Sequence, residues 1–267
     1  MPQSPAPVAH VADLQRLITR DPGRPRVTWY GDNGERVELS GAVLHNWINK
    51  TVNLLVEEFD AAPGTRVLLD LPPHWRAIVW GLAAWRTGAT LVLAPDAPAR
   101  GTVGQTDVSE EHTLLGLARG VDVVVTSRPT AWTGTDVPVV AVPLPALARR
   151  FDGELPSGAI DAGSAVMTYG DQIGWVEEVD PEAVALEPRA VGHGELMAWG
   201  AESGEDAPPS VRALVQEDST AVLLRRVLQV LAVDGSVVAI APTLTAELDQ
   251  DHQRLDRLRT SERVDMG

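Results

Sequence analysis

The sequence contains no cysteine, and this absence excludes several classes of site at once. Without thiols the chain forms no disulfide, holds no thiolate-bound metal and uses no cysteine nucleophile. The same absence fits a reducing compartment, so we expect a cytoplasmic protein. Residues 1–10 are rich in Pro and Ala and lack the charged and apolar regions of a secretory signal, which predicts a loose tail.

Long hydrophobic runs are also lacking. The most apolar stretch, residues 77–95, is interrupted by Arg86 and Thr87. Neither part approaches the ~20 apolar residues that a membrane-spanning helix needs. We therefore expect no membrane partner.

Basic residues are scarce: Lys and Arg number 22 against 37 Asp and Glu, giving a net charge of −15. This balance argues against binding of phosphate backbones, so we expect no nucleic-acid partner. The single lysine, Lys50, excludes a Walker phosphate loop, and no Gly-x-Ser-x-Gly nucleophile motif is present. The use of arginine almost throughout suggests a GC-rich, actinobacterial-type genome.

What is present predicts an α/β protein. Hydrophobic residues make up 44% of 267 residues, enough for a substantial core. Periodicity and turn signals predict helices at 11–18, 40–59, 75–86, 110–119, 194–200, 220–232 and 248–259. They predict strands at 27–30, 36–39, 66–71, 89–93, 121–126, 137–142, 164–169 and 236–240. Such alternation favours mixed, largely parallel sheets flanked by helices.

A Pro- and Gly-rich stretch, Pro143 to Gly158, is the best candidate boundary in the chain. It divides the sequence into the tail at 1–10, a first α/β subdomain at 11–155 and a second at 156–267, which we expect to pack as one domain. The acidity is concentrated in the second part. Residues 161–267 carry 20 acidic and 8 basic residues, against 17 and 14 before them.

Four segments carry a family resemblance, and they occur in the family's order along nearly the whole chain. They are Arg36-Val37-Glu38-Leu39-Ser40, the stretch Ala83 to Pro95 around Thr87-Gly88-Ala89, Gly120-Val121-Asp122-Val123-Val124-Val125-Thr126-Ser127, and Val191-Gly192-His193-Gly194-Glu195-Leu196. Together they resemble the N-terminal half of the adenylate-forming superfamily, which includes the acyl-CoA synthetases. The resemblance implies the fold of that superfamily's N-terminal subdomains.

The resemblance also implies a phosphate-binding loop, and here the sequence departs from the family. In the family a strand, here expected at Ala165–Tyr169, leads into a Ser/Thr/Gly-rich loop that ends in Pro-Lys-Gly. The corresponding residues are Thr168, Tyr169, Gly170, Asp171 and Gln172, a degenerate candidate for cofactor binding. Residues 161–206 hold 11 acidic side chains and Arg189 alone as a base, a field that repels triphosphate.

Further family features are expected to be absent. The chain ends near Glu262 to Asp265, before the family's adenine-binding segment, its ribose-binding aspartate and the C-terminal domain with its catalytic lysine. Lys50 lies in an early helix and does not match that lysine. We therefore expect no catalytic residues, no cofactor and, on balance, no enzyme.

Two residues remain candidates for substrate binding. His193 matches a family position near the acyl pocket, although a histidine that helps to cap a helix is the favoured interpretation. Trp175 lies in the altered loop, where it could line a pocket. By contrast, Trp75, Trp80 and Trp85 fit a helix core better than a binding platform.

A metal site is not expected. Asp249, Asp251 and His252 imitate a ligand set, but the neighbouring Arg254 and Arg257 indicate a solvated ion-pair face. The spacing of His252 from Leu248 and Leu255 instead predicts that its side chain packs beside the apolar stripe of the last helix.

Three functions stay open. The first is a non-catalytic scaffold, a pseudoenzyme, that binds an acyl or nucleotide ligand, a protein partner or a second copy of itself. The second is one half of a split acyl-CoA-synthetase-like enzyme. The third is a different enzyme using Asp171, Glu177 and Glu178, although adjacent residues in a strand point to opposite faces.

Overall fold

The computed structural model describes residues 8–95, 108–202, 204 and 206–267, so most of the predicted tail lies outside the described residues. The helices are α1 Val11–Ile18, α2 Gly41–Phe59, α3 Trp75–Thr87, α4 Val108–Ala118, α5 Ala162–Ala165, α6 Leu196–Ala201, α7 Thr220–Ala232, α8 Pro242–Leu248 and α9 His252–Glu262. The strands are β1 Pro25–Tyr30, β2 Arg36–Ser40, β3 Arg66–Asp70, β4 Thr90–Leu93, β5 Val123–Thr126, β6 Val139–Ala141, β7 Ile160–Asp161, β8 Val184–Glu187, β9 Val191–Gly192, β10 Arg212–Val215 and β11 Ser236–Ile240.

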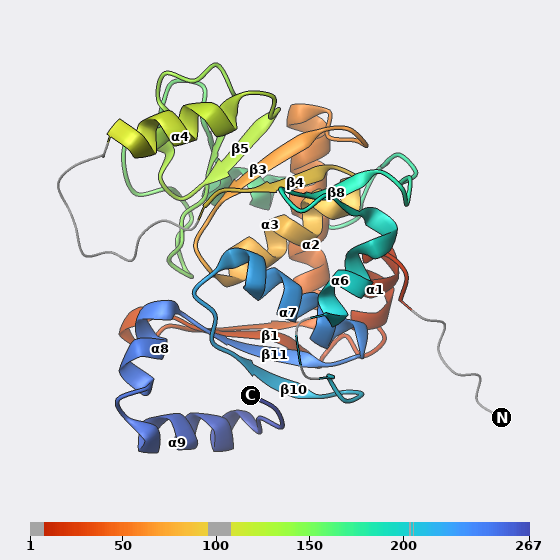
Figure 1. Cartoon of the computed structure of the whole chain (residues 1–267), viewed down its shortest axis with the longest axis vertical. Coiled ribbons are helices and arrows are strands. Elements are labelled where there is room, and N and C mark those ends of the chain that lie inside the picture. Colours follow the sequence, from red (N-terminus) through yellow and green to blue (C-terminus); the bar gives the residue numbers. More distant parts are fainter. Residues whose placement is uncertain (1–7, 96–107, 203, 205) are drawn as a thin grey trace.

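The strands form two sheets with a layer of helices between them (Figure 1). One sheet has the order β10-β11-β1-β2, and the other has the order β7-β6-β5-β3-β4-β8-β9. Only β1 with β2 and β8 with β9 pair antiparallel, and the remaining pairs are parallel. The predicted α/β class with mixed, largely parallel sheets is therefore confirmed.

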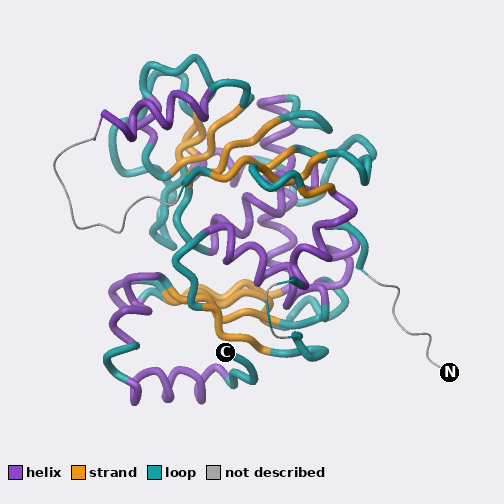
Figure 2. Tube along the Cα trace, viewed as in Figure 1, coloured by secondary structure: helices purple, strands orange, loops and turns teal. Residues whose placement is uncertain are grey.

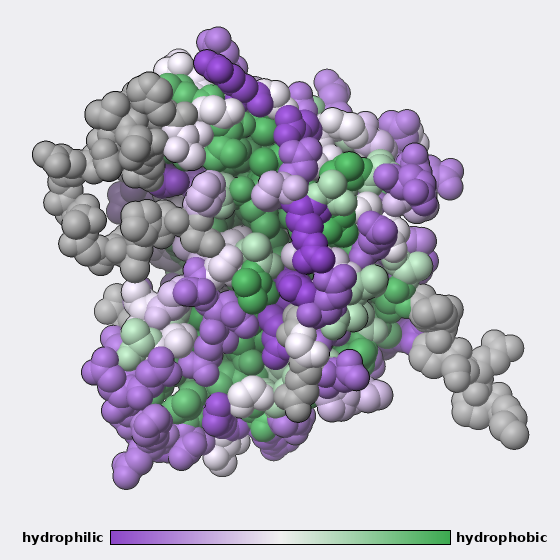
Figure 3. Space-filling view, in the orientation of Figure 1, coloured by the Kyte–Doolittle hydropathy of each residue, from purple (hydrophilic) through white to green (hydrophobic). Residues whose placement is uncertain are grey.

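The middle layer contains α1, α2, α3, α6 and α7, as the tube view also shows (Figure 2). On the outer sides, α4 covers part of the seven-stranded sheet and α9 lies below the four-stranded one. Hydrophilic side chains dominate the visible surface over α8 and α9 (Figure 3). Each sheet takes strands from both sides of residue 155.

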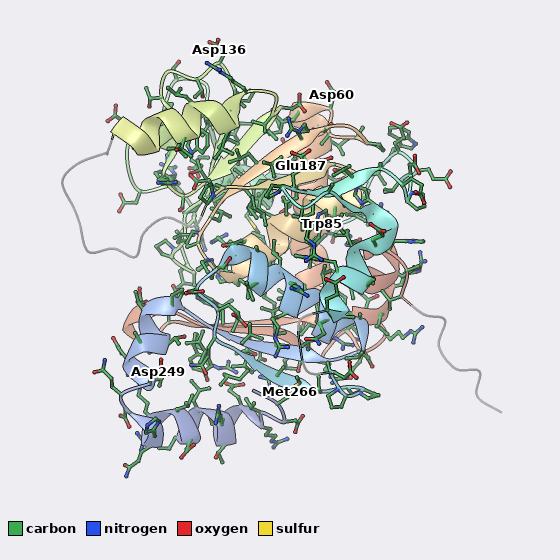
Figure 4. The ribbon with its side chains drawn as sticks, viewed as in Figure 1. Asp60, Trp85, Asp136, Glu187, Asp249 and Met266 are labelled. Carbon is green, nitrogen blue, oxygen red and sulfur yellow. The ribbon has the colours of Figure 1, made fainter. Side chains whose placement is uncertain are left out.

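Helix α3 shows why the middle layer holds together. Nearly all its side chains are buried, as expected for a helix enclosed by other elements. Trp75, Trp80 and Trp85 are each at most 3% exposed, which confirms their core role. Trp85 lies among the central helices (Figure 4), and its indole N–H donates to the carbonyl of Ala185 at 2.8 Å.

Local signals set the ends of the two central helices. Ser40 caps α2 by accepting from the amide of Val43 at 3.3 Å, and Asp60 ends it with a left-handed φ of 49°. His74 caps α3, whose end is Gly88 at a φ of 87°. These boundaries agree with the sequence prediction to within a residue or two.

Two predicted elements are wrong. The strand expected at residues 164–169 is instead α5 followed by a 3₁₀ turn at Val166–Thr168. The side chain of Asp161 accepts from the amide of Gly163 at 2.9 Å and so starts a helical turn there. The long helix expected at 248–259 is broken into α8 and α9, because Asp251 caps a new helix by accepting from the amide of Arg254 at 2.9 Å.

Four strands escaped prediction: β7, β8, β9 and β10. Of these, β7 and β9 have only two residues each, too few for a periodic pattern. Within the described part of the chain, no helix has the length and apolar character needed to cross a bilayer.

Candidate functional site

The predicted phosphate-loop residues are held against α2 by side chains of that helix. The Asn53 amide donates to the carbonyls of Gly170 and Gln172, at 3.0 and 2.8 Å. The Asn49 amide donates to the carbonyl of Asp171 at 2.8 Å. This part of the loop therefore presents its carbonyl oxygens to the helix.

The rest of the predicted loop is anchored in the same way. Lys50, the single lysine, donates to the carbonyl of Tyr169. The hydroxyl of Tyr169 bonds to the carboxylate of Glu58, and burial together with this carboxylate raises the pKa of the tyrosine. The Thr168 hydroxyl donates to the carbonyl of Ala165 at 2.8 Å. A phosphate site needs several backbone N–H groups aimed at one point, whereas these bonds organise carbonyls.

The strands that lead to His193 are β8 and then β9, and not the predicted strand at 164–169. Between β8 and β9 lie only Pro188, Arg189 and Ala190. Because proline has no N–H, this turn offers at most two amides to a phosphate. The segment directly before His193 is therefore too short to wrap a triphosphate.

His193 itself is 3% exposed and its Nε2 lies 3.0 Å from the carbonyl of Gly88, the residue that ends α3. Burial lowers the pKa of His193, which keeps the ring neutral and able to donate to that carbonyl. Its role in the structure is to tie β9 to the end of α3. Trp175 is 71% exposed.

The predicted packing of His252 is wrong, since its side chain is exposed on α9. The ion-pair face expected nearby is present, because Arg254 lies 3.0 Å from Glu247. Among the described residues, no group of three or more potential metal ligands comes together.

A different site lies at the start of α3, where sequence reasoning did not place one. A small pocket opens there between α2, α3 and α5. Its walls are Trp47, Thr51, Trp75, Arg76, Val79, Trp80, Ala162 and Val166. We refer to it as the α3 pocket.

Among the described residues that line the α3 pocket, Arg76 alone is charged, and it is just 6% exposed. Its guanidinium lies over the ring of Trp75 at 4.3 Å and over that of Trp47 at 5.5 Å. One nitrogen, Nη2, donates weakly to the carbonyl of Pro145 at 3.4 Å, while Nε is buried without a hydrogen-bond partner. No carboxylate of the described residues forms a salt bridge with Arg76.

Burial lowers the pKa of Arg76 to about 10, with the charge of Glu35 acting in the opposite direction. The guanidinium is thus still cationic at neutral pH. Glu35 does not pair with it, since its carboxylate accepts from the amide of Ala146 at 2.7 Å. The pocket therefore contains a buried positive charge that no anion of the described residues neutralises by direct contact.

His74 orients the start of α3. Its Nδ1 accepts from the amide of Arg76 at 3.1 Å, and its ring packs edge-on against Trp29 at 4.7 Å. Burial, followed by the charge of Arg76, lowers the pKa of His74 to about 3, so the ring is neutral. The only sequence signal for this site was Pro72-Pro73-His74 before a tryptophan-rich helix, which marks a helix start and carries no chemistry by itself.

Comparison with known proteins identifies the family of this chain. No family model matches the chain. It is 34% identical over 233 residues to the TIGR03089 family protein of Mycobacterium tuberculosis (strain ATCC 25618 / H37Rv), with 86% of this chain and 88% of that relative covered. The chain belongs to the TIGR03089 family.

Solved structures similar to this TIGR03089 family protein are adenylate-forming enzymes. Acetoacetyl-CoA synthetase from Streptomyces lividans has a TM-score of 0.67 and 15% identity, over 88% of this chain and 38% of that enzyme. The acyl-CoA synthetase of Brucella canis has a TM-score of 0.64 and 18% identity, over 86% and 43%. An amide bond synthetase of Marinactinospora thermotolerans has a TM-score of 0.61 and 18% identity, over 91% and 47%.

At these identities the similarity establishes the fold alone. The TIGR03089 family protein spans less than half the length of each of these enzymes.

Proposed function

We propose that this TIGR03089 family protein is a non-catalytic, small-molecule-binding protein built on the adenylate-forming fold. The observation that carries the proposal is the attachment of residues 169–172 to α2. The side chains of Asn49, Lys50 and Asn53 donate hydrogen bonds to four successive backbone carbonyls of this segment. A loop held in this way is unsuited to cradle the phosphates of ATP.

The charge around this segment supports the same conclusion. The loop that continues from Gly170 carries Asp171, Glu177, Glu178 and Asp180, all exposed. Without a metal to compensate, these carboxylates repel a triphosphate. A neutral or singly charged ligand encounters much less repulsion.

The α3 pocket is where we expect the ligand to bind. It combines aromatic and aliphatic walls with two polar side chains, Thr51 and Arg76, and its free volume of about 10 Å³ has to widen before it admits more than a water molecule. It adjoins the loop that the family resemblance singled out, since its wall residue Val166 belongs to the same 3₁₀ turn as Thr168. The scaffold is thus proposed to keep the fold of the enzymes and to use the region beside that loop for recognition.

Thermal unfolding with a ligand panel tests the proposal. The panel contains ATP with Mg²⁺, AMP, CoA, an acyl-CoA and free organic acids, each compared with buffer of equal ionic strength. A ligand at 100 times its dissociation constant stabilises by about 2.7 kcal/mol, or roughly 5 °C or more for a chain of this size. We expect a shift from at least one small molecule and none from ATP with Mg²⁺.

A shift with ATP and Mg²⁺, or release of pyrophosphate in the presence of an acid, would overturn the proposal in favour of an enzyme. Silence across the panel would also overturn it and would favour a protein partner.

A further inference from the structure

We propose that this TIGR03089 family protein forms a symmetric dimer through β2, an edge strand of its four-stranded sheet. The occupant of that edge is β2 of a second copy, running antiparallel around a two-fold axis at Val37. In this arrangement Arg36 of each copy lies opposite the partner's Glu38. The surface shares no residue with the α3 pocket, and its use does not depend on the small-molecule function proposed above.

The four-stranded sheet has one closed edge and one open edge. At β10 the last residues of the chain continue the sheet, since the amide of Leu214 donates to the carbonyl of Met266 at 2.8 Å. The amide of Asp265 likewise donates to the carbonyl of Arg212 at 2.8 Å. At β2, on the opposite edge, no strand or loop of the described residues pairs in this way. An unpaired row of N–H and C=O groups is a template for another strand.

The hydrogen bonds between β1 and β2 show which backbone groups face the open edge. The two strands pair antiparallel, and the amide of Gly31 donates to the carbonyl of Glu35 at 2.9 Å. Hydrogen-bonded and non-hydrogen-bonded positions alternate along such a pair. Counting from this bond, Arg36 and Glu38 occupy non-hydrogen-bonded positions. Their N–H and C=O groups therefore point away from β1, where a further strand could reach them.

The charges of β2 select one register of self-pairing. The side chains of Arg36 and Glu38 are 41% and 39% exposed and lie 2.7 Å apart on one face of the strand. Registers that set Arg36 against itself, or Glu38 against itself, place like charges directly opposite, which destabilises a sheet. The register that sets Arg36 against the partner's Glu38 brings opposite charges together twice. The segment Arg-Val-Glu is thus complementary to itself across a two-fold axis, as an isologous interface requires.

The competing explanation is that the two charges guard the edge against pairing, a common device of edge strands. Residues 36–39 include no proline or lysine, and the irregularity of the β1–β2 pair lies in β1, between Pro25 and Val27. The two explanations make opposite predictions for Glu38→Arg. If the charges pair across a dimer, this reversal separates the copies. If the charges guard the edge, the wild-type protein is a monomer.

Sedimentation velocity of the full chain tests the association. An interface made by one short strand is small, so we expect a dissociation constant on the order of 10 µM. Glu38→Arg is expected to raise this constant by about tenfold or more, because both cross-strand pairs become repulsive. Asp136→Arg makes the same change of charge at an exposed site far from the four-stranded sheet (Figure 4) and should leave the constant unchanged.

A proline variant tests the role of the backbone. Glu38→Pro removes an outward-facing N–H and leaves the ladder between β1 and β2 in place, as edge strands tolerate. We expect the variant to be monomeric, with a circular dichroism spectrum like that of the wild-type protein. If Glu38→Pro fails to fold, Glu38→Arg still decides, since it changes only an exposed side chain.

The register is tested by cross-linking, for which a chain without cysteine is well suited. At the two-fold axis, Val37 and its counterpart form a non-hydrogen-bonded pair with Cα atoms about 4.5 Å apart, within the range of a disulfide. Val37→Cys is therefore expected to form a covalent dimer when oxidised with diamide. Leu115→Cys, on α4 at a side chain that is 39% exposed, is the matched control and should stay uncross-linked.

A covalent dimer of Val37→Cys, together with dissociation of Glu38→Arg, would support the β2 interface. A wild-type protein that stays monomeric at 20 times the expected dissociation constant would overturn it. So would a dimer whose dissociation constant is the same in Glu38→Arg, or equal cross-linking of Val37→Cys and Leu115→Cys.

Discussion

Asn53 on α2 and Gln172 in the loop after α5 are joined by a hydrogen bond of 2.8 Å, although 119 residues separate them in the chain. The same amide also donates to Gly170, and its carbonyl oxygen accepts from the amide of Gly174 at 3.3 Å. One buried asparagine therefore determines the path of a loop that has no secondary structure of its own.

Replacing this asparagine is expected to free the loop. Asn53→Ala removes three hydrogen bonds, each contributing on the order of 1 kcal/mol, so we expect a loss of about 2 kcal/mol in the free energy of unfolding. Urea denaturation measures the loss, and limited proteolysis near Trp175 should become faster. Asn46→Ala, a change on the same helix at a side chain whose Oδ1 has no partner, is the matched control. Equal stability of the two variants would contradict the assignment.

His74 makes stability depend on pH above the range of the carboxylates. Burial lowers its pKa from 6.5 to about 3, so below pH 6.5 the unfolded chain binds a proton that the folded chain does not. Stability is therefore full above pH 6.5 and falls by roughly 1.4 kcal/mol per pH unit below it, or about 2 kcal/mol at pH 5.

Urea denaturation at pH 7 and pH 5 tests this dependence. His74→Asn keeps a side chain able to cap α3 and is expected to be less sensitive to pH by about 2 kcal/mol over that interval. The same pH dependence in the variant and the wild-type protein would show that His74 is not the responsible group.

Glu262 makes the stability of the fold depend on pH in a lower range than His74 does. Burial raises its pKa, but hydrogen bonds from Arg36, Tyr30 and Arg212 prevail and lower it to about 2. Its contribution is fully present above pH 4.5 and is lost as the pH falls towards 2. We expect Glu262→Gln to cost about 2 kcal/mol at pH 7 and little at pH 2.5.

A matched control for Glu262 is Glu247→Gln, on the exposed pair with Arg254. Exposed pairs contribute at most about 1 kcal/mol, so this variant should differ little from the wild-type protein at either pH. An equal effect of the two substitutions would mean that Glu262 does not anchor α9 to the four-stranded sheet.

Two glycines in helices are expected to respond differently to alanine. A Cβ at Gly41 would lie 2.1 Å from the carbonyl oxygen of Ile18, and neither backbone has room to move, so we expect a loss of about 3 kcal/mol or more. A Cβ at Gly81 would meet a terminal methyl of the buried Leu224 at 2.9 Å, and a side-chain end shifts more easily than backbone. Because alanine also favours the helix by about 1 kcal/mol, Gly81→Ala should be nearly neutral. Thermal unfolding of the two variants measures the difference. A larger loss of stability in Gly81→Ala than in Gly41→Ala would contradict the prediction.

Most of the long elements were predictable because their signals are local. The period of α7, the cap at Ser40 and the apolar run of β11 each lie within a few neighbouring residues. The short strands β8 and β10 were missed, and only their pairing with β4 and β11 in the structure identifies them. The strand predicted at 164–169 failed because the side chain of Asp161 favours a helical turn over an extended chain.

For the candidate site, too, some features follow from the sequence and others only from the tertiary structure. By itself, the sequence determined the α/β class, the resemblance to adenylate-forming enzymes and the lack of a lysine-bearing phosphate loop, since these depend on composition and on the order of segments. Only the tertiary structure decided that Arg76 is buried between Trp47 and Trp75 without a counterion and that Asn53 holds the carbonyls of the loop. Burial and pairing are properties of side chains brought together from distant parts of the chain, and no local pattern encodes them.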